Sequence, residues 1–320
     1  MGFGHDTTTD EVLEGIDLTG KRALVTGASG GLGEETARAL ASKGAAVTIA
    51  ARNVAKAQAA ADKIKESTGN PNIDVLELEL SVPDSVRKAA AEYLERYDSL
   101  NILVNNAGVM ACPLTRTVEG WEMQLATNHF GHFLFTNLLI PALKAGAPAR
   151  VVNLSSAGHR MSDVDFDDPH FDNRDYDKWV SYGQSKTANV LFSVGLNERL
   201  APSGVTANAV HPGGIQTELG RHLSPEDIQA LVSQIDERNG EDAEFKFKSI
   251  PAGAATSTWV ATSPELEGVG GRYAEDCHLA EVADTGFGGE GVAPYAVDKT
   301  NAEKLWALTE EALGQKFELG

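Results

Sequence analysis

The feature that most constrains the fold is an alternation between short apolar segments and longer helix-prone segments along most of the chain. The apolar segments predict strands at 23–28, 45–51, 73–80, 100–108, 149–156, 205–213 and 271–277. The segments between them predict helices at 34–43, 54–66, 85–95, 121–143 and 181–200. Strands joined by long helices run parallel, and right-handed crossovers place the helices on both faces of the sheet. The pattern predicts an α/β fold with a doubly wound, mainly parallel sheet of about seven strands.

The 320 residues divide into a short N-terminal extension, residues 1–17, and one large domain, residues 18–320, because no linker interrupts the rest. In the extension, Thr8 and Glu11 have the spacing of a capping box, which predicts a brief helix.

Two segments, 158–180 and 218–250, break the alternation of strands and helices after the fifth and sixth predicted strands. Ligands bind at the carboxyl edge of open parallel sheets, so these segments are predicted to shape a substrate pocket.

The composition restricts the partners. Acidic residues outnumber basic ones by 46 to 27, giving a net charge of −19 and a pI near 4.8. Such a surface disfavours nucleic acids and anionic membranes. We find no apolar core of a signal peptide at the N-terminus and no run approaching the roughly 18 residues of a membrane span. Cys112 and Cys277 are too few for a disulfide framework. The interpretation is a cytoplasmic protein without a membrane span.

A glycine-rich turn, TGASGGLG (Thr26 to Gly33), separates the first predicted strand from the first long predicted helix. Gly27 permits a tight turn, Gly31 lets the backbone approach a phosphate, and Gly33 lets the helix pack closely. The start of a helix then offers N–H groups to a pyrophosphate. The turn predicts a Rossmann-type dinucleotide site, with a purely structural turn as the alternative.

The end of the second predicted strand bears on the choice of dinucleotide. NAD-binding proteins often place a carboxylate there to accept hydrogen bonds from the ribose hydroxyls. Here Ala51 supplies none, and Arg52 follows, whose guanidinium suits a bidentate contact with a 2′-phosphate. NADP(H) is therefore favoured. The alternative is that Arg52 is a solvated side chain and that NAD(H) binds without the usual acid.

A tyrosine and a lysine provide a candidate proton carrier. Tyr182 and Lys186 lie four residues apart in SYGQSK, on a predicted helix, and therefore share one face. An ammonium near a phenol favours the phenolate and is expected to lower the tyrosine pKa. The pair predicts a general acid/base that works near neutral pH.

These motifs, taken in order, resemble those of the short-chain dehydrogenase/reductase family over about residues 18–315. The landmarks are TGASGGLG, NNAG (105–108), the asparagine of NHFGHF (128–133), VVNLSS (151–156), YGQSK (182–186) and HPGGIQT (211–217). The sequences of the segments NNAGVM, NHFGHFLFTNLL, SSAGH and YGQSKTANVLF are most similar to those of the retinol-dehydrogenase-like branch. The resemblance implies an oxidoreductase that acts on lipophilic alcohols, aldehydes and ketones.

The resemblance also implies a role for each catalytic residue. Tyr182 would be the general acid/base, Lys186 would lower its pKa and hold the nicotinamide ribose, and Ser156 would bind the reacting oxygen. Asn128 would support a proton relay through water to Lys186. Ser155 is a rival for Ser156, which is favoured because it ends the stretch that begins at Asn153. No metal is implied.

The implied cofactor contacts extend over the whole predicted carboxyl edge. They comprise Gly27, Ser29, Gly31, Leu32, Gly33, Arg52, Glu79, Leu80, Asn106, Ala107, Gly108, Tyr182, Lys186, Pro212, Gly213, Ile215 and Thr217. Glu79 stands where the family often has an aspartate near the adenine, which leaves that contact open.

Two alternative functions remain at this point. One is an NAD(H)-dependent alcohol dehydrogenase of the same fold, and the other is a dinucleotide-sensing regulatory protein without turnover. The helix at 181–200 offers Val190, Leu191, Phe192 and Val194 for subunit packing, so a homodimer or homotetramer is compatible with the sequence. His129 and His132 have metal-ligand spacing, but packing or a local hydrogen bond is the favoured interpretation.

Overall fold

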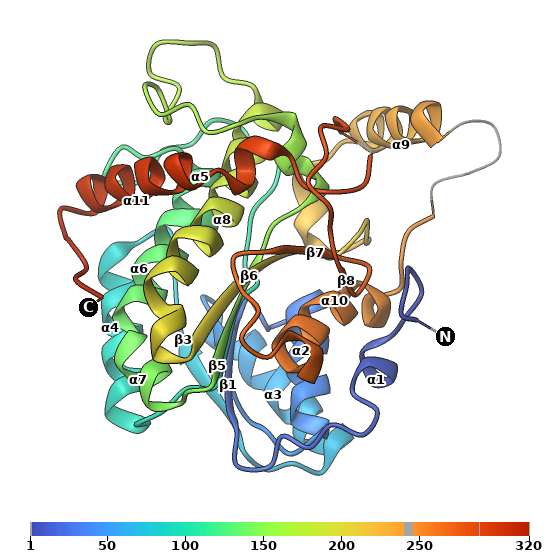
Figure 1. Ribbon diagram of the computed structural model, residues 1–320, viewed down its shortest axis with the longest axis vertical. Helices are drawn as coiled ribbons and strands as arrows, with labels where there is room; N and C mark the ends of the chain where they lie inside the picture. The colour runs from blue at the N-terminus through green and yellow to red at the C-terminus, as the bar shows by residue number, and fades with distance from the viewer. Residues whose placement is uncertain (1, 240–245, 288, 320) are drawn as a thin grey trace.

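The computed structural model describes residues 2–239, 246–287 and 289–319. Its centre is one sheet of eight strands in the order β3-β2-β1-β4-β5-β6-β7-β8 (Figure 1). The strands are β1 (Arg22–Thr26), β2 (Ala46–Ala51), β3 (Ile73–Glu77), β4 (Ile102–Asn105), β5 (Ala149–Leu154), β6 (Val205–His211), β7 (Tyr273–Glu275) and β8 (His278–Leu279). All neighbouring strands run parallel except β7 and β8, which are antiparallel. The predicted doubly wound α/β fold is confirmed.

The eighth strand is the difference from the predicted sheet. It has two residues and follows a turn in which Asp276 and Cys277 both have positive φ angles, 46° and 57°. Two residues after a tight turn carry no recognisable period, so the alternation of apolar residues could not predict this strand.

Helices cover both faces of the sheet (Figure 1). The principal helices are α1 (Thr9–Val12), α2 (Gly31–Ser42), α3 (Val54–Thr68), α4 (Pro83–Arg96), α5 (Met123–Leu125), α6 (Gly131–Leu138), α7 (Ile140–Ala145), α8 (Lys178–Leu200), α9 (Pro225–Asn239), α10 (Ile250–Thr262) and α11 (Lys299–Leu313). The expected helix at 121–143 is divided, because a π-helical turn, η1 (Ala126–Phe130), separates α5 from α6, and Pro141 lies in the first turn of α7.

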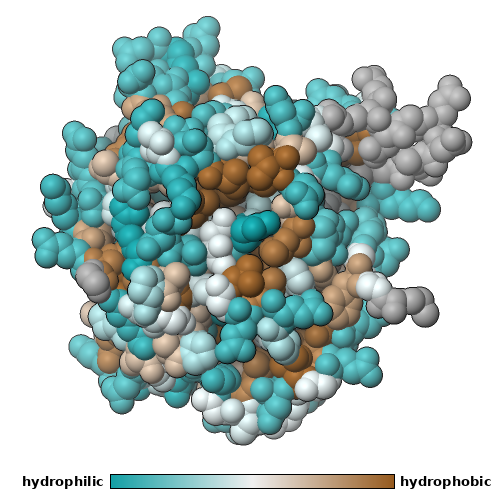
Figure 2. Space-filling view, viewed as in Figure 1, coloured by the Kyte–Doolittle hydropathy of each residue, from teal (hydrophilic) through white to brown (hydrophobic). Residues whose placement is uncertain are grey.

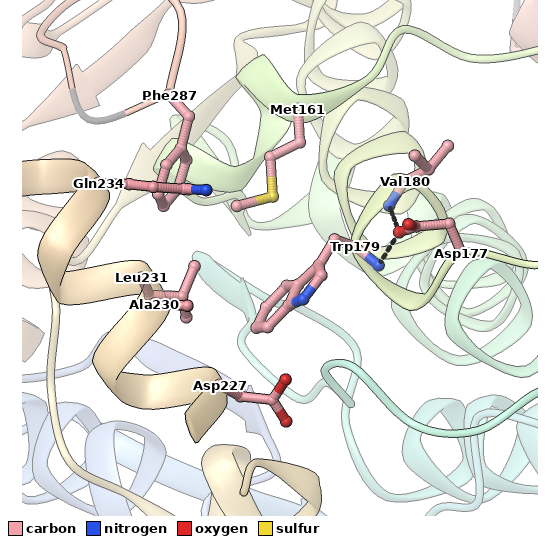
Figure 3. Close-up of a pocket in the computed structure, with 9 residues that line it drawn as sticks. All are labelled: Met161, Asp177, Trp179, Val180, Asp227, Ala230, Leu231, Gln234 and Phe287. Atoms are coloured by element: carbon pink, nitrogen blue, oxygen red, sulfur yellow. Dashed lines mark hydrogen bonds between the residues drawn. The ribbon is translucent and has the colours of Figure 1, made fainter. Parts of the chain in front are cut away.

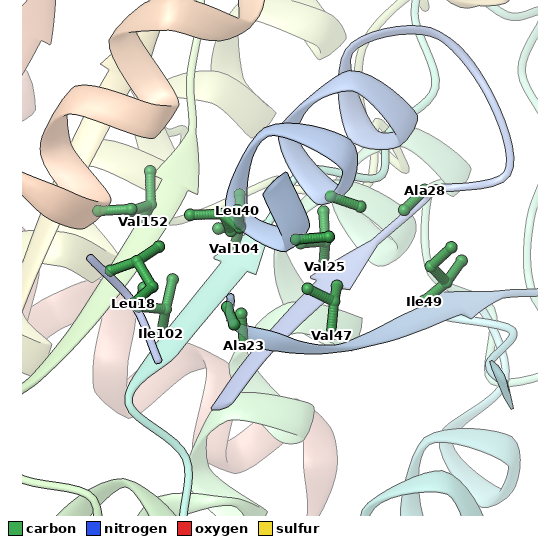
Figure 4. Close-up of a cluster of buried hydrophobic side chains, with 14 of the residues drawn as sticks. Leu18, Ala23, Val25, Ala28, Leu40, Val47, Ile49, Ile102, Val104 and Val152 are labelled. Atoms are coloured by element: carbon green, nitrogen blue, oxygen red, sulfur yellow. The ribbon is translucent and has the colours of Figure 1, made fainter. Parts of the chain in front are cut away.

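The core has two main layers because neighbouring strand residues point to opposite faces. Val25 packs with α2, α3 and α10, together with Val47, Ile49 and Val104 of the adjacent strands (Figure 4). Leu24, one residue earlier, packs on the other face with side chains of α4, α6 and α8. The reversal of strand order beside β1 therefore leaves the turn after β1 at the switch point of the sheet, where ligands bind in such folds.

Both chain ends pack onto the domain. The capping box predicted from Thr8 and Glu11 is present at the start of α1, which packs against α10. Near the other end, α11 begins after the capping residue Asp298 and packs along α8. Polar side chains dominate the face shown in Figure 2, and hydrophobic ones gather in a few small groups near its middle.

The packing of α11 corrects one expectation. Val190, Leu191, Phe192 and Val194 of α8 are all at least 95% buried within the chain, so their side chains are not available on the surface for subunit packing. Leu191 and Val194 lie in a cluster with Ala302 and Leu305 of α11. No described helix combines the length and the apolar character that crossing a bilayer requires.

Candidate active site

The predicted site residues come from four loops at one edge of the sheet. The glycine-rich turn follows β1, residues 106–108 follow β4, Ser156 follows β5 and residues 212–217 follow β6. Because these strands are parallel, their carboxyl ends meet at the same edge. Tyr182 and Lys186 approach this edge from α8.

The glycines of the turn are required by close approach. Gly27 has a φ of 66°, and a β-carbon on it would lie 2.8 Å from the Cα of Ala107. A β-carbon on Gly33 would lie 2.5 Å from the Nδ2 of Asn106 and 2.6 Å from the carbonyl oxygen of Gly27. The turn after β1 and the segment after β4 therefore touch through backbone, which no larger residue at Gly27 or Gly33 would permit.

The start of α2 fits an anionic group. Gly30 is its N-cap and offers no side chain to the first N–H groups, which lack partners within the helix. Gly31, with a φ of 58°, lies next to the side chain of Thr217 from the loop after β6. Leu32 and Ile215 both pack against Gly253 of α10. These contacts bring Gly31, Leu32, Ile215 and Thr217 together around a helix N-terminus that can hold a dinucleotide's pyrophosphate.

An exposed cation and a carboxylate lie together at the ends of β2 and β3. The Nη1 atom of Arg52 is 3.9 Å from the Oε2 atom of Glu79, and the arginine side chain is 68% exposed. The Oε1 atom of Glu79 accepts hydrogen bonds from the amide and hydroxyl of Ser81, at 3.2 and 2.9 Å. The sequence indicated each residue separately, whereas the structure makes them one charged pair.

Ser156 is the serine that faces Tyr182. Its hydroxyl acts on the pKa of the phenol, and both groups lie beside Gly158, whose amide donates to the Oγ atom of Ser156 at 3.0 Å. Ser155 points elsewhere, because its hydroxyl donates to the carbonyl oxygen of Lys186 at 2.9 Å. Adjacent residues of an extended segment point in opposite directions, which explains why only one of the two serines reaches the phenol.

The electrostatics of Tyr182 differ from the expectation. Burial raises the pKa of Tyr182 to about 12, while the neighbouring hydroxyl of Ser156 acts to lower that pKa. Burial also lowers the pKa of Lys186 to about 8. The Nζ atom of Lys186 donates to the carbonyl oxygen of Leu154 at 3.0 Å and is 5.7 Å from the centre of the Tyr182 ring. In the protein chain alone, burial therefore has the largest effect on the pKa of Tyr182.

Asn128 lies in the π-helical turn η1 and is held by three side-chain hydrogen bonds. Its amide bonds both backbone groups of Val109, at 2.8 and 2.9 Å, and the hydroxyl of Ser185 at 2.9 Å. A β-carbon on Gly108 would lie 3.1 Å from the Oδ1 atom of Asn128 and 3.6 Å from the Nζ atom of Lys186. The predicted catalytic asparagine, the lysine and residue 108 are thus neighbours.

A cleft of about 330 Å³ opens beside the start of α8 (Figure 3). Its lining residues are Met161, Asp177, Trp179, Val180, Asp227, Ala230, Leu231, Gln234 and Phe287. Most of them come from the two segments that the sequence singled out, whereas Phe287 had no sequence signal. Lys178 joins the walls by donating to both carboxylate oxygens of Asp227 at 2.7 Å.

The residues with metal-ligand character have other partners. His129 hydrogen-bonds Thr309 at 2.9 Å and His132 hydrogen-bonds Thr26 at 2.8 Å, and both partners are far away in the sequence. Within residues 2–239, 246–287 and 289–319, no group of three or more His, Cys, Asp or Glu side chains is arranged to hold a metal ion. Burial raises the pKa of Cys112 to about 11, as in an unreactive thiol.

Comparison with known proteins agrees with this geometry. Residues 21–228 match the family model described as short chain dehydrogenase. A probable oxidoreductase of Streptomyces antibioticus is 45% identical over 93% of this chain and 99% of its own. Human retinol dehydrogenase 13 is 40% identical over 93% of this chain and 86% of its own. A Burkholderia cenocepacia short chain dehydrogenase, solved in complex with NADP, is 27% identical over 81% of this chain and 97% of its own, with a TM-score of 0.64.

The family model and the relatives support an enzyme over the dinucleotide sensor that was the alternative. They also agree with the sequence motifs that resembled the retinol-dehydrogenase-like branch. This chain is therefore an oxidoreductase that belongs to the short-chain dehydrogenase/reductase family, in its retinol-dehydrogenase-like branch.

Proposed function

We propose that the protein is an NADP(H)-dependent oxidoreductase that interconverts a lipophilic primary or secondary alcohol with its aldehyde or ketone. The observation that carries the proposal is the closeness of Ser156 and Tyr182, with the ammonium of Lys186 5.7 Å from the centre of the ring, at the sheet edge that also bears the glycine-rich turn. A nicotinamide ring bound at this edge supplies or takes up the hydride.

The proton is handled by the chain's own residues. With a pKa near 12, Tyr182 is a neutral phenol at physiological pH, which is the form that donates a proton to a carbonyl oxygen during reduction. Ser156 binds the same oxygen and stabilises the charge that develops on it. Lys186, which remains largely protonated at pH 7, holds the nicotinamide ribose, and Asn128 supports the relay that returns a proton.

The preference for NADP(H) rests on Arg52. Its guanidinium is exposed at the end of β2, where it can take a 2′-phosphate in a bidentate contact. The solved Burkholderia relative holds NADP, which agrees with this choice. Glu79 supports the alternative, since its carboxylate lies 3.9 Å from the guanidinium and would repel a 2′-phosphate there.

Fluorescence titration with NADPH and NADH tests the cofactor assignment. Arg52→Ala should weaken NADPH binding by about tenfold or more and leave NADH binding nearly unchanged, because only NADPH loses a charged contact. Glu79→Gln is the companion variant. Tighter binding of NADH than of NADPH to the parent protein would favour the NAD(H) alternative.

The lining of the cleft supports a lipophilic substrate. Met161, Trp179 and Leu231 come from three different elements and present apolar surface to the same cleft (Figure 3), and Val180 lies two residues before Tyr182. The proposed substrate therefore lies between these apolar side chains with its oxygen toward the phenol. Trp179→Ala should raise KM for bulky ketones more than for short ones, because the larger substrates lose more buried contact area.

Turnover itself is tested with NADPH and a panel of lipophilic aldehydes and ketones. Tyr182→Phe should lower kcat by roughly 10²–10⁴-fold, since the proton donor is lost, and should leave the cofactor Kd near that of the parent. Turnover of this variant at the parental rate would contradict the assigned mechanism. A cytoplasmic location and a homodimeric or homotetrameric state remain predictions from the sequence.

A further inference from the structure

One buried histidine joins the cofactor turn to the catalytic asparagine. His132 lies in α6, one turn after Asn128, and is 1% exposed. Its Nδ1 atom is 2.9 Å from the carbonyl oxygen of Asn128, and its Nε2 atom is 2.8 Å from the hydroxyl of Thr26. Thr26 ends β1 and precedes the first glycine of the turn, so the imidazole spans the two halves of the site.

The hydrogen bonds of Thr26 determine which ring nitrogen carries the proton. Its Oγ1 atom accepts from the backbone amides of Asn106 and Ala107, at 2.9 and 3.0 Å. A hydroxyl has two acceptor sites and one proton, so the proton of Thr26 is left for the Nε2 atom of His132. The Nδ1 atom then bears the imidazole hydrogen and donates it to the carbonyl of Asn128.

The carbonyl of Asn128 lies in a segment whose backbone hydrogen bonds differ from those of a regular α-helix. Within η1, the amide of Gly131 bonds the carbonyl oxygen of Ala126, five residues back, instead of one four residues back. A π-helical turn of this kind shifts the direction of its carbonyl groups, and side chains can take over the bonds that the regular ladder loses. His132 supplies such a bond to Asn128. Burial lowers the pKa of His132 to about 4, so the ring stays neutral in this role at pH 7.

We propose that His132 is a positioning residue which couples the dinucleotide shelf formed by residues 106–108 to the carbonyl of Asn128. A cofactor bound on the shelf fixes the position of the two amides that donate to Thr26. The imidazole, which bonds Thr26 and the carbonyl of Asn128, then couples that position to the position of Asn128. The inference rests on the proposed function, because it assumes a dinucleotide on the shelf and a relay at Asn128.

The chain offers a matched control three residues away. His129 is 0% exposed, lies in the same helical segment, and hydrogen-bonds Thr309 of α11, outside the site. Substitutions at His129 therefore report the cost of changing a buried histidine here without touching the cofactor turn. Both positions should be changed to Asn and to Gln.

Each replacement at His132 keeps one half of the bridge. The amide nitrogen of an asparagine can lie near the position of the Nδ1 atom. His132→Asn therefore keeps the hydrogen bond to the carbonyl of Asn128 and loses the hydrogen bond to Thr26. The cofactor Kd should then rise about fivefold or more, with a smaller change in kcat. The amide group of a glutamine reaches the position of the Nε2 atom. His132→Gln therefore keeps the hydrogen bond to Thr26 and loses the hydrogen bond to the carbonyl of Asn128. There kcat should fall about fivefold or more, with a near-parental Kd.

The His129 variants should lower the melting temperature without separating Kd from kcat. If the His132 variants change both quantities in parallel, or change them no more than the His129 variants do, the coupling is refuted. A parent protein that turned over no carbonyl substrate would instead contradict the proposed function, so the two failures can be told apart.

The tautomer can be measured on the unmodified protein. With ¹⁵N-labelled histidine, the signals that disappear in whichever His132 variant folds identify this ring, so only one folded variant is needed. We expect a protonated Nδ1 and an unprotonated Nε2. A proton on Nε2 would mean that Thr26 does not donate to the ring, and would overturn the bridge.

Discussion

Gly158 lies directly against the ring of Tyr182, and a β-carbon on it would come within 2.8 Å of the Cε1 atom of the tyrosine. The same β-carbon would lie 3.4 Å from the Oγ atom of Ser156. The position of the phenol relative to the serine therefore depends on the absence of a side chain at residue 158.

This contact predicts the effect of Gly158→Ala. The added methyl group must displace the phenol or the short helix that carries residue 158, and a shift of about 1 Å at a reacting group can cost around 10²-fold in rate. We expect kcat to fall by at least tenfold while the cofactor Kd stays close to parental. Steady-state kinetics with NADPH titration would show this, and an unchanged kcat would mean that the ring moves without consequence.

The two adjacent serines should behave differently. Ser156→Ala removes a donor to the reacting oxygen, for which a loss of about 10²–10³-fold in kcat is typical. Ser155→Ala removes only the bond to the carbonyl of Lys186, so we expect a loss of stability of about 1 kcal/mol with most activity retained. Comparison of kcat and urea unfolding for both variants checks the assignment, and a larger kcat loss in Ser155→Ala would reverse it.

Lys186 should make stability depend on pH. Burial lowers its pKa from 10.5 to about 8, so between these values the unfolded chain binds a proton that the native chain does not. Stability contributed by this group therefore rises as pH increases from about 8 to 10.5. Urea unfolding across this range should show a steeper rise for the parent than for Lys186→Met. Parallel curves would show that the lysine is not protonated differently in the two states.

The start of α11 provides a stability prediction unrelated to catalysis. The spacing of Thr300 and Glu303 predicts a capping box, but the structure begins the helix at Lys299, where Asp298 accepts from the amide of Asn301 at 2.8 Å. Asp298→Ala should lower the free energy of unfolding by about 0.5–2 kcal/mol. Thr300→Ala should change it by less than about 0.5 kcal/mol, since Thr300 is exposed within the helix. Equal losses would contradict the observed cap.

Much of the fold was predictable because it depends on local pattern. Six of the seven predicted strands contain all or most of the residues of β1 to β6, and the seventh contains β7. Buried parallel strands are apolar over their whole length, and the helices between them are long enough to give a clear contrast. Their ends were less predictable. The expected strand at 100–108 stops at Asn105, for example, because Asn106 turns to bond Thr26.

The sequence by itself determined the α/β order, the glycine-rich turn and the Tyr182–Lys186 pairing, because each is written in residues close together in the chain. Only the tertiary structure decided which serine meets the phenol, that burial raises the pKa of Tyr182, and that α11 covers the face of α8. It also joined Thr26 to His132 across 106 positions of sequence. Such contacts depend on where the packed sheet and helices bring distant side chains together, and hydrophobic periodicity carries no record of that placement.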